Sequence, residues 1–195
     1  MEALKNLFLN LSNIFSLENR KGGFLAADAL IEATHQIDNP KQFDNRFFYD
    51  VKSNLDSKGH ILNQIVLKAS PFIKWSGSDL REERIPEELA NQMPMAELIG
   101  PDGLYYNDTV RVGLWLQNKD IVYGPRQHEA EETFFIFNGE ACWWTEESKL
   151  ELKGSNSYVF HPSNILHTSI TTDSPVFTAW RWSGEIGFEK YKLHH

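Results

Sequence analysis

The sequence predicts a mainly β protein, a jelly-roll barrel preceded by an α-helical N-terminal cap. Two observations predict this fold. Before about residue 70, apolar side chains recur at helical spacing. From about residue 95, short apolar runs alternate with turn residues, as in antiparallel barrels. A chain of 195 residues suits one domain with an appendage. We therefore expect the cap (1–94) and the barrel (95–195) to form one structural unit.

The helical cap is expected to contain several amphipathic segments. The first covers residues 2–17, where Leu4, Leu7, Phe8 and Leu11 share one face. Gly22-Gly23 is expected to interrupt the helical pattern before a second helix begins at about residue 25. Asn39-Pro40 resembles a helix start and predicts a third helix. The expected helices are 2–17, 25–36, 40–55 and a short exposed one within 79–92. The apolar segment 61–67 fits a helix or a buried strand, and a helix is favoured.

The barrel is predicted from alternating and aromatic runs. Residues 110–117 alternate apolar side chains with Arg111, Gly113, Trp115 and Gln117, which predicts a strand with one buried face. Residues 134–137 form an aromatic and β-branched run that ends at Asn138-Gly139, a strong hairpin signal. We expect a tight turn there. The expected strands are 96–99, 110–117, 121–124, 131–137, 140–146, 149–152, 157–161, 166–171 and 176–182.

Composition narrows the classes of partner. The net charge is −8 and there is no run rich in Lys or Arg, so nucleic acid and anionic membranes are not expected partners. Cys142 is the single cysteine, which excludes an internal disulfide and a cysteine-based zinc site. No apolar run approaches membrane-spanning length and no targeting segment is visible. We expect a cytoplasmic protein that acts on a small molecule, and a homodimer stays open.

Three residues have the chemistry of a metal site. His128, Glu132 and His167 provide two imidazoles and one carboxylate, a ligand set that suits one divalent transition metal. The identity of the metal stays open among Fe, Zn, Mn and Ni. In a strand, Glu132 shares a face with Phe134 and Ile136, so we expect it to point into the barrel.

These positions resemble the conserved motifs of the cupin superfamily. His128, Glu132 and Gly139 follow the later half of the first motif, and residues 154–167, with Pro162, resemble the second. The resemblance implies a cupin double-stranded jelly roll with a bound metal. One departure is clear, because Arg126 occupies the position of a fourth ligand, the first histidine of the family's His-x-His pair.

A closer resemblance is to the dimethylsulfoniopropionate (DMSP) lyase family of cupins. It is carried by Tyr123 five residues before His128, by His161-Pro162 with His167, and by the run 180–186. It implies β-elimination of DMSP, or of a related small β-substituted carboxylate, to dimethyl sulfide and acrylate. Two alternatives stay open: another metal-dependent cupin enzyme (an oxygenase or isomerase of a small acid or sugar), and a non-catalytic cupin that binds a small ligand.

The resemblance also implies roles around the metal. These lyases carry a tyrosine two residues after the metal-binding Glu, and here that position is Phe134. Tyr123 is therefore the candidate base, although it could be a packing residue. Tyr49 or Tyr106 could supply the phenol that Phe134 lacks.

Other residues are expected to line the pocket or to support the ligands. Arg126 could bind a substrate carboxylate, or it could turn outward into an ion pair. Trp180 and Trp182 share one strand face and could contact a sulfonium ion through cation–π interactions. His161 and Glu131 are expected outside the ligands, where His161 orients a ligand or caps a strand end and Glu131 faces away from the cavity.

Overall fold

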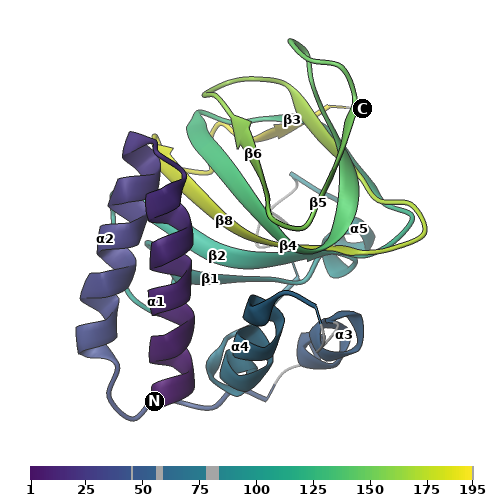
Figure 1. The fold of residues 1–195 in the computed structure, drawn as a ribbon. Helices are drawn as coiled ribbons and strands as arrows, with labels where there is room; N and C mark the ends of the chain where they lie inside the picture. Colours follow the sequence, from purple (N-terminus) through teal and green to yellow (C-terminus); the bar gives the residue numbers. More distant parts are fainter. Residues whose placement is uncertain (45, 56–58, 78–83, 195) are drawn as a thin grey trace.

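A computed structural model describes residues 1–44, 46–55, 59–77 and 84–194 of the chain. Helices occupy the first part and strands the second (Figure 1). The helices are α1 (Glu2–Leu17), α2 (Lys21–Gln36), α3 (Phe47–Asn54), α4 (Ile61–Ala69), a 3-10 turn (Ser70–Phe72) and α5 (Glu87–Asn91). The strands are β1 (Met95–Ile99), β2 (Val110–Gln117), β3 (Val122–Gln127), β4 (Ala130–Thr145), β5 (Glu151–Gly154), β6 (Ser157–His161), β7 (His167–Ile170), β8 (Val176–Gly184) and β9 (Lys192–Leu193).

The barrel consists of two groups of antiparallel strands, which we call the first and the second ladder, and β4 belongs to both. The first half of β4 pairs with β6 and β8, and β8 continues through β2 to β1. The second half of β4 pairs with β5 and β7, and β7 continues through β3 to β9. Figure 1 shows β4 curving through the middle of the barrel between these two groups. The predicted cupin jelly roll with a helical N-terminus is confirmed.

The predicted hairpin at Asn138-Gly139 is wrong. β4 passes through these residues as one strand, and its pairing with β8 shifts register between Ile136 and Asn138. Gly139 has φ of +71°, and a Cβ atom there would lie 1.9 Å from the carbonyl oxygen of Pro175. The Asn-Gly pair therefore forms a bulge that bends β4 from one ladder to the other, because a bulge uses the same positive φ as a hairpin turn.

Two helix boundaries also differ from the predictions. Gly22 and Gly23 lie in the first turn of α2 instead of breaking the helix. A Cβ atom on Gly22 would lie 2.2 Å from Ser183 Oγ, so this glycine allows α2 to approach β8 closely. The third helix begins at Phe47 and not at Pro40. Part of the helix predicted within 79–92 lies outside the described residues, and its described part is α5.

Helices α1 to α4 cover the outer face of the first ladder. In Figure 1, α1 and α2 stand side by side at one end of the barrel, and α4 lies below β1. Buried side chains of α1, α2 and α4 form one core with Val112, Leu114, Phe137 and Phe177. All residues of β2 are buried, so the prediction of one buried face was wrong. Its second face points into the barrel, where Trp115 belongs to a separate aromatic core.

A buried ion pair joins the helices to the barrel. Glu18, directly after α1, pairs with Arg181 of β8, and their side chains are 2% and 0% exposed. Arg181 Nε donates to Glu18 Oε2 at 3.0 Å, and the Thr133 hydroxyl donates to Glu18 Oε1 at 2.7 Å. This ion pair lies on the helix-facing side of β4 and β8. The opposite side of the two strands faces the interior of the barrel.

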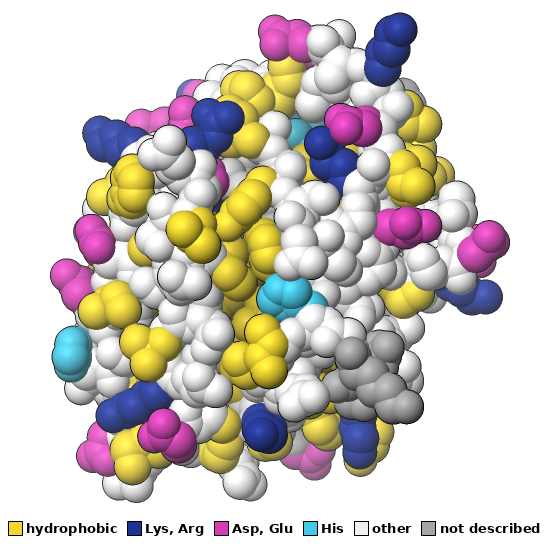
Figure 2. All heavy atoms as spheres, in the orientation of Figure 1, with side chains coloured by type: hydrophobic (Ala, Val, Ile, Leu, Met, Phe, Trp, Pro, Cys, Tyr) yellow, Lys and Arg dark blue, Asp and Glu magenta, His cyan; other side chains and the backbone are white. Residues whose placement is uncertain are grey.

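The face drawn in Figure 2 combines dispersed charges with an apolar band. Figure 2 shows hydrophobic side chains gathered between the helical layer and the barrel, with acidic and basic side chains spread around them. Within the described ranges, no helix combines the length and the apolar character needed to cross a bilayer.

Candidate metal centre

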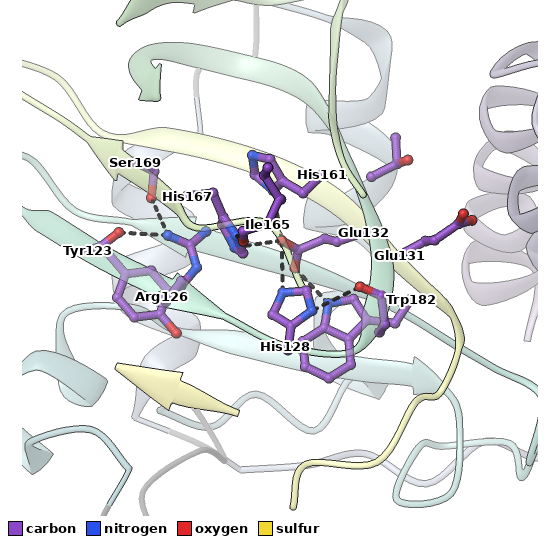
Figure 3. A network of polar contacts seen from close by, with 12 residues as sticks. Tyr123, Arg126, His128, Glu131, Glu132, His161, Ile165, His167, Ser169 and Trp182 are labelled. Atoms are coloured by element: carbon purple, nitrogen blue, oxygen red, sulfur yellow. Dashed lines mark hydrogen bonds and ion pairs between the residues drawn. The ribbon is translucent and has the colours of Figure 1, made fainter. Parts of the chain in front are cut away.

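His128, Glu132 and His167 meet inside the barrel. His128 directly follows β3, Glu132 lies near the start of β4, and His167 begins β7. One potential ligand atom from each residue lies within 4.8 Å of the other two, and the residues are only 2%, 5% and 0% exposed. Figure 3 shows both imidazoles pointing toward the Glu132 carboxylate. The structure thus brings the three predicted ligands together.

Strand alternation explains why Glu132 points inward. Phe134 and Ile136 pack in the aromatic core of the barrel, whereas Phe135 and Phe137 pack against the helices. Glu132 follows the first pair and Thr133 the second, as the period of a strand requires. The predicted assignment of faces on β4 is confirmed.

The hydrogen bonds of the two histidines select one tautomer. His128 Nδ1 lies 3.0 Å from the Ala130 carbonyl oxygen, and His167 Nδ1 lies 2.9 Å from that of Ile165. A carbonyl only accepts, so each Nδ1 carries the hydrogen and each Nε2 presents a lone pair. The Nε2 atoms of His128 and His167 lie 3.5 and 3.4 Å from Glu132 Oε2.

These lone pairs make the cluster fit a metal ion. Both Nε2 atoms are buried and have no hydrogen-bond partner in the described part of the chain. Buried polar atoms are rarely left unpaired, and a divalent cation between two imidazoles and a carboxylate would satisfy all three groups. The donor set of two histidines and one carboxylate leaves positions open for a substrate.

Two neighbours orient the Glu132 carboxylate. Trp182 Nε1 donates to Glu132 Oε1 at 2.7 Å, and His161 Nδ1 lies 3.1 Å from Oε2. His161 is 0% exposed, and its ring stacks on that of His167. The tryptophan therefore holds one carboxylate oxygen, and His161 holds the oxygen that also faces the two open Nε2 atoms.

The pKa shifts agree with a site prepared for a cation. Burial alone would raise the pKa of Glu132, but the surrounding histidines hold that pKa well below its usual range. Burial lowers the pKa of His167 strongly, and the nearby His161 and Arg126 add to the effect. Burial also lowers the pKa of His161, against the opposing effect of Glu132. The Glu132 carboxylate is thus ionised and the His167 imidazole is neutral, which are the forms that bind metal.

Arg126 lies inside the site with an unused donor. It is 2% exposed, and its Nη1 donates to the Tyr123 carbonyl oxygen at 2.6 Å and to Ser169 Oγ at 3.4 Å (Figure 3). Its Nη2 is buried without a hydrogen-bond partner among the described residues. The predicted alternative of an outward ion pair is wrong, because the side chain turns into the barrel.

The cavity beside the cluster is aromatic. Its volume is about 50 Å³, and it is partly open to solvent. Phe134, Trp180 and Trp182 line it as predicted, and Trp115 completes this wall. Tyr123 also lines it and is 5% exposed. Burial raises the pKa of Tyr123, and the neighbouring Arg126 opposes this rise.

Three other candidate residues lie away from the cavity. Tyr49 and Tyr106 are 71% and 73% exposed, so neither supplies the phenol that Phe134 lacks. Glu131 is exposed and its carboxylate points away from the cluster (Figure 3). The Glu131 carbonyl oxygen accepts a hydrogen bond from Arg181 Nη1 at 3.2 Å.

Sequence reasoning missed the contribution of the C-terminal segment. Phe188 and Tyr191 both line the cavity, and the Tyr191 hydroxyl hydrogen-bonds to that of Tyr123. The sequence of this segment has neither helical nor strand periodicity. Its isolated aromatic residues are the feature that indicates a contribution to the cavity.

The chain also matches a known protein family. Residues 43–178 match the profile of the family described as dimethylsulfoniopropionate lyase. The chain belongs to this family. Within the match lie the three predicted ligands together with Tyr123, Arg126 and Phe134.

Relatives of the lyase family share both sequence and fold with the chain. The DMSP lyase DddQ of Ruegeria pomeroyi is 33% identical over 89 residues, which are 46% of this chain and 44% of that relative. The chain thus spans less than half the length of this curated relative in the alignment. The crystal structure of R. pomeroyi DddQ superposes with a TM-score of 0.72 and 21% identity, covering 98% of this chain and 96% of that one. A structure reported with the DMSP lyases RdDddP and RnDddQII gives a TM-score of 0.70 and 18% identity, covering 100% and 99%.

Proposed function

We propose that this chain is a metal-dependent cupin lyase that cleaves DMSP, or a related small β-substituted carboxylate, by β-elimination. The observation that carries the proposal is one cavity in which an open His-His-Glu cluster, a buried guanidinium with a free Nη2 and a phenol meet. Membership of the DMSP lyase family and relatives described as DMSP lyases support the substrate class.

His128, Glu132 and His167 would hold one divalent metal through two Nε2 atoms and the carboxylate. A divalent cation supplies positive charge that neutralises a substrate carboxylate, acidifies the neighbouring C–H bond and favours a phenolate nearby. Fe, Zn, Mn and Ni all accept this ligand set.

Arg126 is the group that binds the substrate carboxylate. Its free Nη2 is a buried donor, and a charge-assisted hydrogen bond from it to a carboxylate is strong. In the described part of the chain, no carboxylate forms an ion pair with this guanidinium, so an anionic ligand would supply the missing counter-charge.

The aromatic wall binds the other end of the substrate. Trp115, Trp180 and Trp182 line the same cavity as Arg126, and aromatic faces attract a sulfonium ion by about 0.5–2 kcal/mol each. The guanidinium repels the same sulfonium. The carboxylate of DMSP is therefore drawn toward Arg126 and the sulfonium toward the tryptophans.

Tyr123 is the base. Its phenolate oxygen takes the proton on the carbon next to the carboxylate, and the C–H electron pair forms the new C=C bond of acrylate. The bond from the β-carbon to sulfur breaks, and its electron pair leaves with dimethyl sulfide. Arg126 assists because its guanidinium carbon lies 4.1 Å from the centre of the Tyr123 ring and its charge opposes the effect of burial on the pKa of Tyr123.

The test is direct assay of the reaction. Purified protein is freed of metal, reloaded separately with Fe(II), Zn, Mn or Ni, and incubated with DMSP while headspace dimethyl sulfide and acrylate are measured. We expect both products in equal amounts with at least one metal. Tyr123→Phe should lower turnover by about 10²–10⁴-fold, the usual contribution of a general base. Absence of dimethyl sulfide with all four metals contradicts the proposal.

One observation favours a second candidate function. Phe134 stands where the family's lyases carry a tyrosine, and its ring packs on Trp115 and Trp143 with centroids 5.3 and 5.0 Å apart. A site that lacks this phenol could instead oxygenate a small acid at the same metal cluster. Oxygen consumption by the Fe(II) protein on other small acids, without dimethyl sulfide from DMSP, would identify this reaction.

A further inference from the structure

The C-terminal segment, residues 185–194, closes one side of the cavity. Phe188 and Tyr191 line the cavity from this segment, and Figure 1 shows the chain ending beside β3. The family profile ends its match at residue 178.

The segment is fastened at both ends. Near its start, Arg111 Nε donates to the Ile186 carbonyl oxygen at 2.9 Å, and the guanidinium lies 4.0 Å from the centre of the Phe188 ring. Arg111 is itself held by Glu97 at 2.7 Å. At its end, β9 pairs with β3, where Leu193 stands opposite Arg126. These contacts fix the position of Tyr191 relative to the site.

Tyr191 contacts two residues of the site. Its hydroxyl shares a hydrogen bond with that of Tyr123, and both side chains are 5% exposed. Its ring lies nearly parallel to that of His128, with an interplanar angle of 12° and centroids 6.0 Å apart. Among the described residues, Tyr123 and Tyr191 are the two phenols that line this cavity.

Resting on the proposed lyase function, we infer that Tyr191 is a positioning residue that holds the Tyr123 hydroxyl in place for proton removal. The Tyr191 O–H donates to the Tyr123 phenolate oxygen and fixes its direction. When Tyr123 takes the proton from carbon, Tyr191 keeps its own proton, so no net charge moves to the C-terminal segment. An unrestrained phenol would instead sample several directions, and a small misplacement of a base costs about 10²-fold in rate.

The kinetic test replaces one hydroxyl at a time. Tyr191→Phe keeps the ring against His128 and removes only the hydroxyl, and the exposed Tyr106→Phe is the matched control. In the metal-loaded protein, we expect Tyr191→Phe to lower kcat for DMSP about 10- to 100-fold. KM should stay within about twofold, because Tyr191 does not bind the substrate carboxylate. Tyr106→Phe should change neither constant.

A double substitution tests whether the two phenols act as a unit. Tyr191→Phe added to Tyr123→Phe should lower kcat by less than about twofold further, because residues that act together are not additive. Losses that multiply in the double variant, or an unchanged kcat in Tyr191→Phe, would overturn the inference.

A second measurement does not depend on activity. In protein labelled with ¹³C at the tyrosine Cζ atoms, the Tyr123 resonance should shift in Tyr191→Phe and stay in place in Tyr106→Phe. Nuclear Overhauser contacts between the Tyr123 and Tyr191 rings should be present in the unsubstituted protein. Absent contacts or an unshifted resonance overturn the inference. If both signals are present and DMSP is not cleaved, the tyrosine pair stands and the proposed lyase function fails.

Discussion

The ring of His161 stacks on the ring of His167, with centroids 4.0 Å apart and an interplanar angle of 22°. His161 also reaches the Glu132 carboxylate with its Nδ1 at 3.1 Å. One imidazole thus restrains two of the three candidate ligands at once. Because all three side chains are buried, their geometry is set by these contacts and not by solvent.

Removal of either histidine ligand should empty the metal site. His128→Ala and His167→Ala each delete an Nε2 lone pair, and the two remaining groups cannot hold a divalent ion tightly. We expect the metal content to fall from about one ion per chain to nearly none, while circular dichroism shows an unchanged fold. The exposed His35→Ala is the matched control and should keep its metal. Full metal content in the two variants by elemental analysis would contradict the ligand assignment.

Loss of the His161 nitrogens should weaken metal binding without abolishing it. His161→Phe retains a ring that can stack on His167 and removes the contact to Glu132. Groups that orient a metal ligand typically contribute 10–100-fold to affinity, so we expect a loss of about that size. Competition with a chromophoric chelator measures the change. An affinity equal to that of the unsubstituted protein would show that His161 only packs.

Arg126→His should exchange a substrate contact for a metal contact. The position corresponds to the first histidine of the cupin His-x-His pair, and the present guanidinium adds a positive charge beside the cluster. We expect metal affinity to rise about tenfold or more, because a fourth ligand replaces a repelling cation. The KM for DMSP should rise by about tenfold or more, because a charged hydrogen bond to the carboxylate is lost. Arg126→Lys is the control that keeps the charge but not the planar fork. An unchanged KM in Arg126→His would remove Arg126 from the substrate site.

Phe134→Tyr should increase lyase turnover. Phe134 lines the cavity at 4% exposure, and its ring lies 5.9 Å from that of His161, so an added hydroxyl enters the site. A second phenol at the position used by the family should raise kcat about tenfold or more, within the range of a general base. Phe135→Tyr, on the opposite face of β4, is the matched control and should not raise it. A lower or unchanged kcat in Phe134→Tyr would indicate that this site has adapted to the phenylalanine.

The ligand strand could be predicted because its pattern is local. Phe134 and Ile136 share the face of Glu132, and a period of two residues fixes that face whatever lies beyond the strand. The Asn138-Gly139 bulge could not be predicted, because an Asn-Gly pair favours positive φ in a hairpin turn and in a bulge alike. Here β8 and the Pro175 carbonyl lie beside this part of β4, and the pair forms a bulge.

Arg126 and Tyr191 depend on long-range pairing. The register of β3 with β7 shifts between Tyr123 and Arg126, so simple alternation does not decide where the Arg126 side chain points. Tyr191 reaches the cavity only because β9 pairs with β3, more than 60 residues earlier in the chain. Neither arrangement leaves a periodic signal in the sequence.

Acidification should destabilise the metal-free protein. The pKa values of His161 and His167 are lowered by burial below their usual value of about 6.5. The unfolded chain therefore binds more protons than the folded chain as pH falls below about 6.5, and the free energy of unfolding decreases. The lowered pKa of Glu132 acts in the same direction at lower pH, below about 4.5.

Urea denaturation between pH 7.5 and 5 tests this expectation in the chelator-treated protein. Each buried imidazole contributes at most about 1.4 kcal/mol per pH unit within the window. His161→Phe should reduce the slope because one of the two titrating groups is removed, and the exposed His35→Ala should leave it unchanged. Bound metal should increase stability near neutral pH and make the loss on acidification steeper, since protons then displace the ion. Stability that is constant or rises on acidification over this range would show that the buried histidines of the folded protein accept protons as readily as those of the unfolded chain.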